Sequence, residues 1–222
     1  MSDCERLATL ASGREIESYR FGTGDFHLLL IGGVHGNEIE GVELINALLS
    51  RFKQSFELNN LTVLIVPNLN PDGVAAVRRQ NDNGVDLNRN MPTKDWSPEA
   101  LKPEYLPGPS AASEIETQVL VKLIDDFSPN FIISMHSFKE AMINTNGDCG
   151  AAADVMHQQC DLPVKDDIGY PTPGSLGTYA GWERAIPTIT LEVLRDEELT
   201  IIIKRILPAL IATIEHFNQN KH

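Results

Sequence analysis

The sequence predicts an α/β fold in which a twisted, mixed but mostly parallel sheet is flanked by helices. Short, dense apolar runs of strand length alternate along the chain with segments of helical period. The apolar runs lack the polar alternation of a half-exposed strand, which is typical of parallel strands covered on both faces. The length of 222 residues, with no internal repeat and no linker-like stretch, predicts a single domain over residues 1–222.

The expected elements follow in chain order. The candidate strands cover residues 27–33, 61–67, 131–135 and 187–193. The candidate helices cover residues 38–52, 113–127 and 196–217. The second helix opens with Ser113-x-x-Glu116, a capping-box pattern, and the third is expected to bend or break near Pro208, because proline lacks the N–H that a helix interior needs.

Residues 91–109 predict a long surface loop, because this stretch carries five prolines and little periodicity. Long loops in compact domains are often functional.

The charge balance excludes two classes of partner. The chain has 18 Lys and Arg residues against 31 Asp and Glu residues, a net charge of −13. A field of that sign repels nucleic-acid phosphates and anionic lipid, so neither nucleic acid nor a membrane is an expected partner. Because the amino-terminal stretch lacks the basic start and apolar run of a signal peptide, we expect a cytoplasmic protein. We expect free thiols at Cys4, Cys149 and Cys160, which suit a reducing compartment.

Polar side chains gather at the ends of three candidate strands. His35 and Glu38 follow the first strand, His136 ends the third, and Glu192 lies near the end of the fourth. Open α/β sheets bind ligands beyond the carboxyl ends of their strands. Two histidines and one glutamate form a common ligand set of catalytic zinc sites, which keep a position for water.

Other interpretations of these residues stay open at this point. Gly32, Gly33 and Gly36 allow a tight or positive-φ backbone around His35. Glycines beside a strand also occur in dinucleotide loops, but neither G-x-G-x-x-G nor the P-loop motif is present. His136 fits a hydrogen-bonded core histidine as well, and Glu192 fits a helix-capping acid.

The segment from residue 68 to 90, NLNPDGVAAVRRQNDNGVDLNRN, is crowded with Asn, Asp and Arg. Asn88 and Arg89 place an amide beside a fork-shaped cation, a pairing suited to holding a substrate carboxylate. The alternative interpretation is a solvated loop.

The motifs GGVHGNE, NPDG, GVDLNRN, SMHS, GYPTPGS and TLEV occur in this order between about residues 27 and 193. Together they resemble the zinc carboxypeptidase family of funnel-type metallopeptidases. The resemblance implies a zinc-carboxypeptidase-like fold and one Zn²⁺ ion held by His35, Glu38 and His136. It also implies that Glu192 is the general base and proton shuttle.

The same resemblance assigns residues to the substrate. It implies that Asn88 and Arg89 hold the carboxylate of the released residue. Arg79 matches the arginine that polarises the scissile carbonyl, and Tyr170 matches the mobile substrate-binding tyrosine. The alternatives to these last two residues are Arg78 and Tyr179.

Within the family, NPDG, NGVDLNRN, residues 107–118 and residues 169–177 resemble bacterial murein peptide amidases. These cytoplasmic enzymes recycle cell-wall peptides by cleaving the γ-D-glutamyl bond to diaminopimelate. The expected substrate is therefore a small peptide with a free carboxylate. SMHSF is closer to digestive carboxypeptidases, so a general metallocarboxypeptidase or a deglutamylase stays an alternative. More distant alternatives are an N-acyl amino acid deacylase and a non-catalytic peptide-binding pseudoenzyme.

Overall fold

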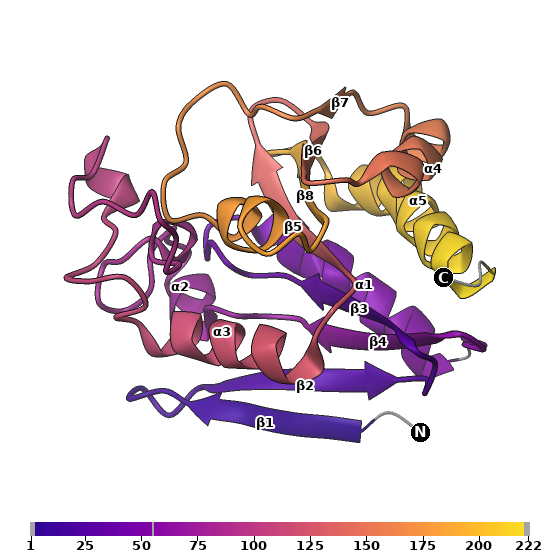
Figure 1. Ribbon diagram of the computed structural model, residues 1–222, viewed down its shortest axis with the longest axis horizontal. Coiled ribbons are helices and arrows are strands. Elements are labelled where there is room, and N and C mark those ends of the chain that lie inside the picture. The colour runs from indigo at the N-terminus through magenta and orange to yellow at the C-terminus, as the bar shows by residue number, and fades with distance from the viewer. Residues whose placement is uncertain (1–2, 55, 220–222) are drawn as a thin grey trace.

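The computed structural model describes residues 3–54 and 56–219. Its centre is an eight-stranded mixed sheet with the order β1-β2-β4-β3-β5-β8-β6-β7 (Figure 1). The strands are β1 (Asp3–Thr9), β2 (Glu15–Phe21), β3 (Phe26–Ile31), β4 (Leu61–Val66), β5 (Phe131–Phe138), β6 (Met142–Asn146), β7 (Val164–Lys165) and β8 (Thr188–Leu194).

The four central strands, β4, β3, β5 and β8, are parallel and coincide with the four predicted apolar runs. The predicted fold class is therefore confirmed. β1 and β2 pair antiparallel on one side, and β6 pairs antiparallel with β8 on the other. These outer strands, together with β7, were not predicted from the sequence.

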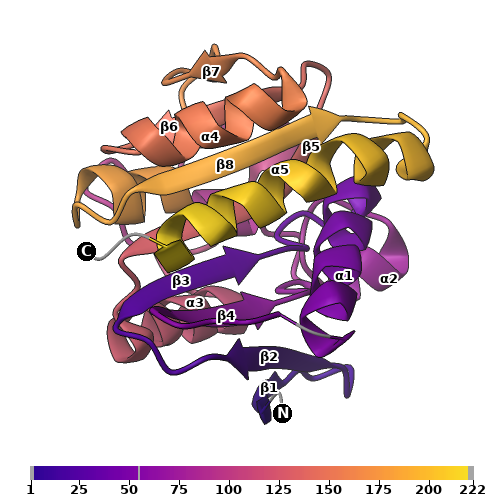
Figure 2. The same cartoon turned by 90° about the vertical axis from the view of Figure 1, so that its right-hand side faces the viewer.

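Helices cover both faces of the sheet. They are α1 (Ile39–Gln54), α2 (Pro71–Ala76), α3 (Ile115–Phe127), α4 (Gly150–Cys160) and α5 (Leu199–Gln219), with short turns η1 (Leu87–Arg89), η2 (Pro103–Tyr105) and η3 (Gly177–Trp182). Figure 2 shows α1 and α5 in front of the sheet and α3 behind it.

Strand β3 shows how this layering follows from the sequence. Its apolar side chains alternate between the two faces, so Leu28 and Leu30 pack in the core under α1 and α5, while Leu29 and Ile31 pack in the core under α3. Each such side chain, fully buried, contributes about 1.5–3 kcal/mol of hydrophobic free energy.

Two details of the helices differ from the prediction. α3 begins at Ile115 and not at a Ser113 cap, because the Ser113 hydroxyl donates to the neighbouring Glu114 carboxylate at 2.6 Å. α5 continues through Pro208, whose side chain is exposed. Ile206, Ala209 and Leu210 beside it are buried, so tertiary packing holds the helix together. The predicted break at this proline is therefore wrong, whereas a bend there stays a prediction.

Residues 91–109 form the expected loop, which contains only the short turn η2. All three cysteines are free thiols, and Cys4 is the exposed one. Among the described residues, no helix has the length and apolar character needed to cross a bilayer.

Candidate active site

Three predicted metal ligands meet at the carboxyl ends of β3 and β5. His35 Nδ1 lies 3.0 Å from Glu38 Oε1, and His136 Nδ1 lies 2.9 Å from Glu38 Oε2. The two Nδ1 atoms are 3.1 Å apart. All three side chains are buried. Three donor atoms this close together can surround one ion, so this donor set fits a divalent metal ion.

Glycines allow the turn that carries His35. Gly33 has φ +65°, a conformation that a side chain makes strained. A Cβ atom on Gly36 would lie 1.9 Å from the backbone carbon of Gly73 in α2. The chain between β3 and α1 therefore needs these glycines to bring His35 and Glu38 to the same point.

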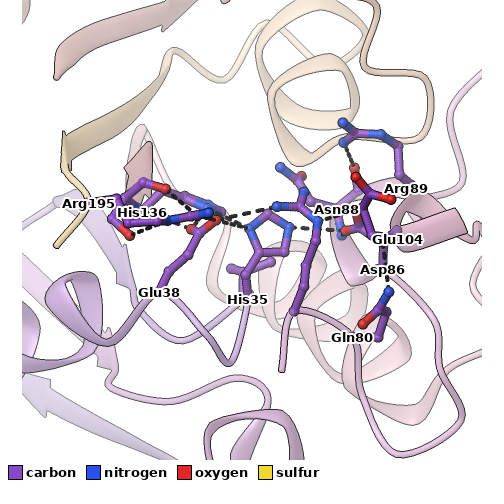
Figure 3. A network of polar contacts seen from close by, with 12 residues as sticks. His35, Glu38, Gln80, Asp86, Asn88, Arg89, Glu104, His136 and Arg195 are labelled. Carbon is purple, nitrogen blue, oxygen red and sulfur yellow. Dashed lines mark hydrogen bonds and ion pairs between the residues drawn. The ribbon is translucent and has the colours of Figure 1, made fainter. Parts of the chain in front are cut away.

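Hydrogen bonds orient both imidazoles. His35 Nε2 lies 3.0 Å from Asp86 Oδ1 (Figure 3). His136 Nε2 lies 2.9 Å from Ser134 Oγ. Burial would raise the pKa of Asp86, but His35 and Arg79 hold it well below its usual range, so Asp86 is an ionised acceptor. Each ring therefore uses its Nε2 for an outer partner and directs Nδ1 at Glu38.

The Glu38 carboxylate is held by donors on several sides. Arg195 Nη2 donates to its Oε1 at 2.8 Å, Arg79 Nη1 donates to the same oxygen at 3.3 Å, and the Ser137 backbone N–H donates to Oε2 at 3.2 Å. Burial would raise the pKa of Glu38, but the two histidines hold it well below its usual range. Glu38 is therefore anionic and has a fixed orientation, as the predicted role of metal ligand requires.

Glu192 faces the same centre from the neighbouring strand. The register of β5 and β8 pairs His136 with Glu192, so their side chains leave the sheet side by side. Glu192 is 5% exposed, and its Oε2 atom has no hydrogen-bond partner among the described residues. Burial raises its pKa to about 7, with Glu38 adding to the effect and His136 opposing it. A carboxylate with a pKa near neutrality is suited to general acid and base catalysis.

The two candidate arginines for the scissile carbonyl have different environments. Arg79 lines the pocket beside His35 and Glu38, and its Nε donates to Asp86 at 2.8 Å. Arg78 forms an ion pair with Asp82 at the surface, 2.6 Å between Nη2 and Oδ1. The geometry thus favours Arg79 over Arg78.

Arg89 offers an unused cation in the same pocket. It is 3% exposed, and its Nε and Nη2 atoms have no hydrogen-bond partner within the described part of the chain. Its neighbour Asn88 also lines the pocket and accepts a hydrogen bond from the Leu176 backbone at 2.8 Å. Free N–H groups on a buried guanidinium are suited to a ligand carboxylate.

Tyr170 lines this pocket, whereas Tyr179, which belongs to η3, is packed in the core with Arg184 over its ring. The pocket is partly open to solvent. The structure thus brings together all the predicted site residues, and it separates Tyr179 and Arg78 from them.

Sequence reasoning missed three contributors. Asp86 was noticed only as part of a polar segment, although it orients His35. Arg195 follows β8 directly, and no spacing rule connects it with Glu38. Tyr105 lies in the proline-rich loop, where nothing in the sequence indicates a contact with the pocket.

The fold, the His-Glu-His cluster and the facing glutamate define a class of metallopeptidase. The sequence profile of the zinc carboxypeptidase family matches residues 5–183. The chain therefore belongs to the zinc carboxypeptidase family, and the predicted hydrolase class is confirmed.

Its relatives include murein peptide amidase A of Vibrio campbellii, 30% identical over 202 residues that cover 85% of this chain and 77% of the relative. The mouse carboxypeptidase N catalytic chain is 31% identical over 189 residues, but these cover only 40% of its length. The crystal structure of the murein-tripeptide amidase from Escherichia coli O157 superposes with a TM-score of 0.80 at 25% identity, covering 99% of this chain and 93% of that one. The predicted resemblance to murein peptide amidases is confirmed.

Proposed function

We propose that this chain is a zinc-dependent peptide hydrolase that cleaves the γ-D-glutamyl–diaminopimelate bond of murein peptides. The observation that supports a substrate with a free carboxylate is the state of Arg89. Its buried guanidinium has N–H groups without a partner among the described residues, and it lies in the pocket that Glu192 also lines. The similarity to murein peptide amidase A supports the choice of bond.

One zinc ion would be held by His35, Glu38 and His136. When bound, zinc supplies a Lewis acid and makes a water molecule more acidic. The ligand set is one carboxylate and two neutral imidazoles, so the site keeps a net positive charge inside a chain whose net charge is −13.

The protein groups divide the remaining work. Asn88 and Arg89 bind the carboxylate of the residue that is released, and this fixes the scissile amide beside Glu192. Arg79 donates to the scissile carbonyl oxygen and stabilises the negative charge that develops there. Glu192 accepts the proton of the attacking water and then delivers it to the leaving amine. Tyr170 closes over the bound peptide.

In this proposal the site residues, the proline-rich loop (residues 91–109) and the sheet form one catalytic domain. We also propose that the protein recycles murein peptides in the cytoplasm. The free thiols of Cys4, Cys149 and Cys160 suit such a reducing compartment.

A substrate panel tests the assignment. The zinc-loaded protein is incubated with the tripeptide L-Ala-γ-D-Glu-diaminopimelate, with blocked dipeptides and with N-acyl amino acids. We expect release of diaminopimelate, loss of activity with a chelator and recovery with zinc. A zinc-loaded protein that releases no diaminopimelate contradicts the amidase assignment.

A general carboxypeptidase is the second candidate. It is favoured by the Arg89 site itself, because a carboxylate grip serves any carboxyl-terminal residue. Turnover of blocked dipeptides without turnover of the tripeptide would establish this alternative.

A further inference from the structure

The ring of Tyr105, in the proline-rich loop, lies against both substrate-facing arginines. Its centroid is 4.9 Å from Arg79 Cζ and 5.0 Å from Arg89 Cζ. We propose that Tyr105 is a positioning residue that holds Arg89 in the orientation that receives the substrate carboxylate. This inference rests on the proposed role of Arg89 as the carboxylate site.

The two arginines depend on Tyr105 to different degrees. Arg79 is already held by ion pairs with Asp86 and Glu38. The hydrogen bond that Arg89 makes runs from its Nη1 to the carbonyl oxygen of the adjacent Asn88, and its Nε and Nη2 have no partner among the described residues. The aromatic ring is therefore the main side-chain support of the Arg89 guanidinium.

An aromatic ring can hold the Arg89 guanidinium without accepting hydrogen bonds from its N–H groups. A cation near a ring is attracted by the electron density of the ring face. This attraction leaves the N–H groups of Arg89 without an acceptor, so they stay available to a substrate carboxylate. An acidic side chain in the place of Tyr105 would occupy those N–H groups and compete with the substrate.

The loop that carries Tyr105 is attached to the segment that carries the arginines. Gln80 Nε2 donates to the Glu104 carbonyl oxygen at 3.0 Å, which Figure 3 shows beside Asp86. The Asp86 backbone N–H donates to the Leu106 carbonyl oxygen at 2.8 Å. Hydrogen bonds on both sides of Tyr105 thus hold the loop backbone from which its ring extends.

Tyr105 also contacts the proposed mobile tyrosine. The rings of Tyr105 and Tyr170 are nearly parallel, 9° between their planes, with centroids 6.1 Å apart. Arg89 Cζ is 6.0 Å from the Tyr170 centroid as well. The Tyr105 ring therefore lies beside both Arg89, the proposed carboxylate site, and Tyr170, which lines the same pocket.

The test compares Tyr105→Leu, which removes the ring, with Tyr105→Phe, which keeps it. The matched control is Leu106→Ala, a truncation of an exposed apolar side chain at the next position of the same loop. All three are made in a Glu192→Gln parent, whose zinc-loaded form is expected to bind the peptide with turnover slowed by about 10²-fold or more. Calorimetry gives the dissociation constants of the tripeptide and of its diaminopimelate α-carboxamide, and thermal denaturation verifies that each variant is folded.

We expect Tyr105→Leu to weaken binding of the free tripeptide by about 5- to 30-fold and binding of the carboxamide by less than about threefold. Tyr105→Phe and Leu106→Ala should stay within about twofold of the parent, because cation–π attraction needs the ring and not the hydroxyl. Unchanged tripeptide binding in Tyr105→Leu, or an equal loss in Tyr105→Phe, overturns the inference. A parent that binds neither ligand contradicts both the proposed function and this inference. If the parent binds the tripeptide but Tyr105→Leu binds it equally well, only the inference on Tyr105 fails.

Discussion

The carboxylate of Asp86 lies 3.0 Å from Nε2 of His35, on the side of the ring opposite to Glu38. Because an ionised carboxylate only accepts hydrogen bonds, this contact places the ring proton on Nε2 and the lone pair of Nδ1 toward the proposed metal position. Asp86 also accepts a hydrogen bond from Arg79, so one buried acid orients both a proposed metal ligand and a proposed catalytic arginine.

Asp86→Asn should weaken zinc binding by about 10- to 100-fold, because an amide supports the His35 tautomer less strongly and no longer neutralises Arg79. Competition with a chromophoric chelator measures the zinc affinity. The control is Asp82→Asn, which removes an acid from the exposed ion pair with Arg78 and should leave zinc affinity unchanged. Equal affinities in the wild type and Asp86→Asn would contradict the role of Asp86.

Glu192→Gln should lower kcat by at least about 10²- to 10⁴-fold while zinc binding stays within about twofold, because Glu192 serves the proton transfer and not the metal. Steady-state kinetics and metal analysis on the same preparation check both parts. Loss of zinc together with activity would indicate that Glu192 is a ligand instead.

The same substitution should stabilise the metal-free protein in a pH-dependent way. The folded-state pKa of Glu192 is raised from 4.5 to about 7, so the folded protein binds this proton more tightly than the unfolded chain does. The contribution of Glu192 to stability is therefore favourable below about pH 4.5 and is lost as the pH rises through 7. At pH 8, Glu192→Gln should raise the free energy of unfolding by about 1–3 kcal/mol. Urea denaturation at pH 8 and pH 4 measures this gain, and a gain of the same size at both values would exclude ionisation of Glu192 as its cause.

Arg89→Ala and Arg79→Ala should affect different kinetic constants. A carboxylate grip acts in the ground state and the transition state alike, so Arg89→Ala should raise KM by about 10- to 100-fold with little change in kcat. Arg79→Ala should lower kcat by about 10²- to 10³-fold, because its charge matters most when the carbonyl oxygen becomes negative. Arg78→Ala is the matched control and should behave like the wild type. A pattern with Arg78 and Arg79 exchanged would reverse the assignment.

Gly36→Ala should destabilise the protein by about 3 kcal/mol or more, since its Cβ atom would lie 1.9 Å from the backbone of Gly73 in α2, so that backbone must shift. Thermal or urea denaturation measures the loss. Gly150→Ala, at the first residue of α4, has its nearest neighbour at 3.4 Å and should be neutral or slightly stabilising. Similar stabilities for the two variants would contradict the close approach at Gly36.

The central strands could be predicted because residues buried on both faces form dense apolar runs, such as Leu28–Ile31 in β3 and Val63–Val66 in β4. The sequence did not predict β6, whose segment MINTN contains three polar residues and becomes a strand through pairing with β8. The Ser113 cap and the break at Pro208 were wrong for the same reason, since local signals were overridden by packing and by a neighbouring side chain.

The cluster of His35, Glu38 and His136 could be predicted because motif and strand end coincide at each of these residues. Arg195 and Tyr105 could not, because their contacts with Glu38 and Arg89 join segments that no sequence spacing relates. Such contacts depend on the register of β8 and on the path of a long loop, both of which are fixed only by the folded structure.

The most direct test of the proposed metal centre is anomalous diffraction at the zinc absorption edge from crystals of the zinc-loaded protein. We predict a single peak about 2.0–2.2 Å from His35 Nδ1, His136 Nδ1 and a Glu38 carboxylate oxygen, with Glu192 facing its open side. A zinc peak at another site, or coordination that leaves out either histidine, would contradict this account.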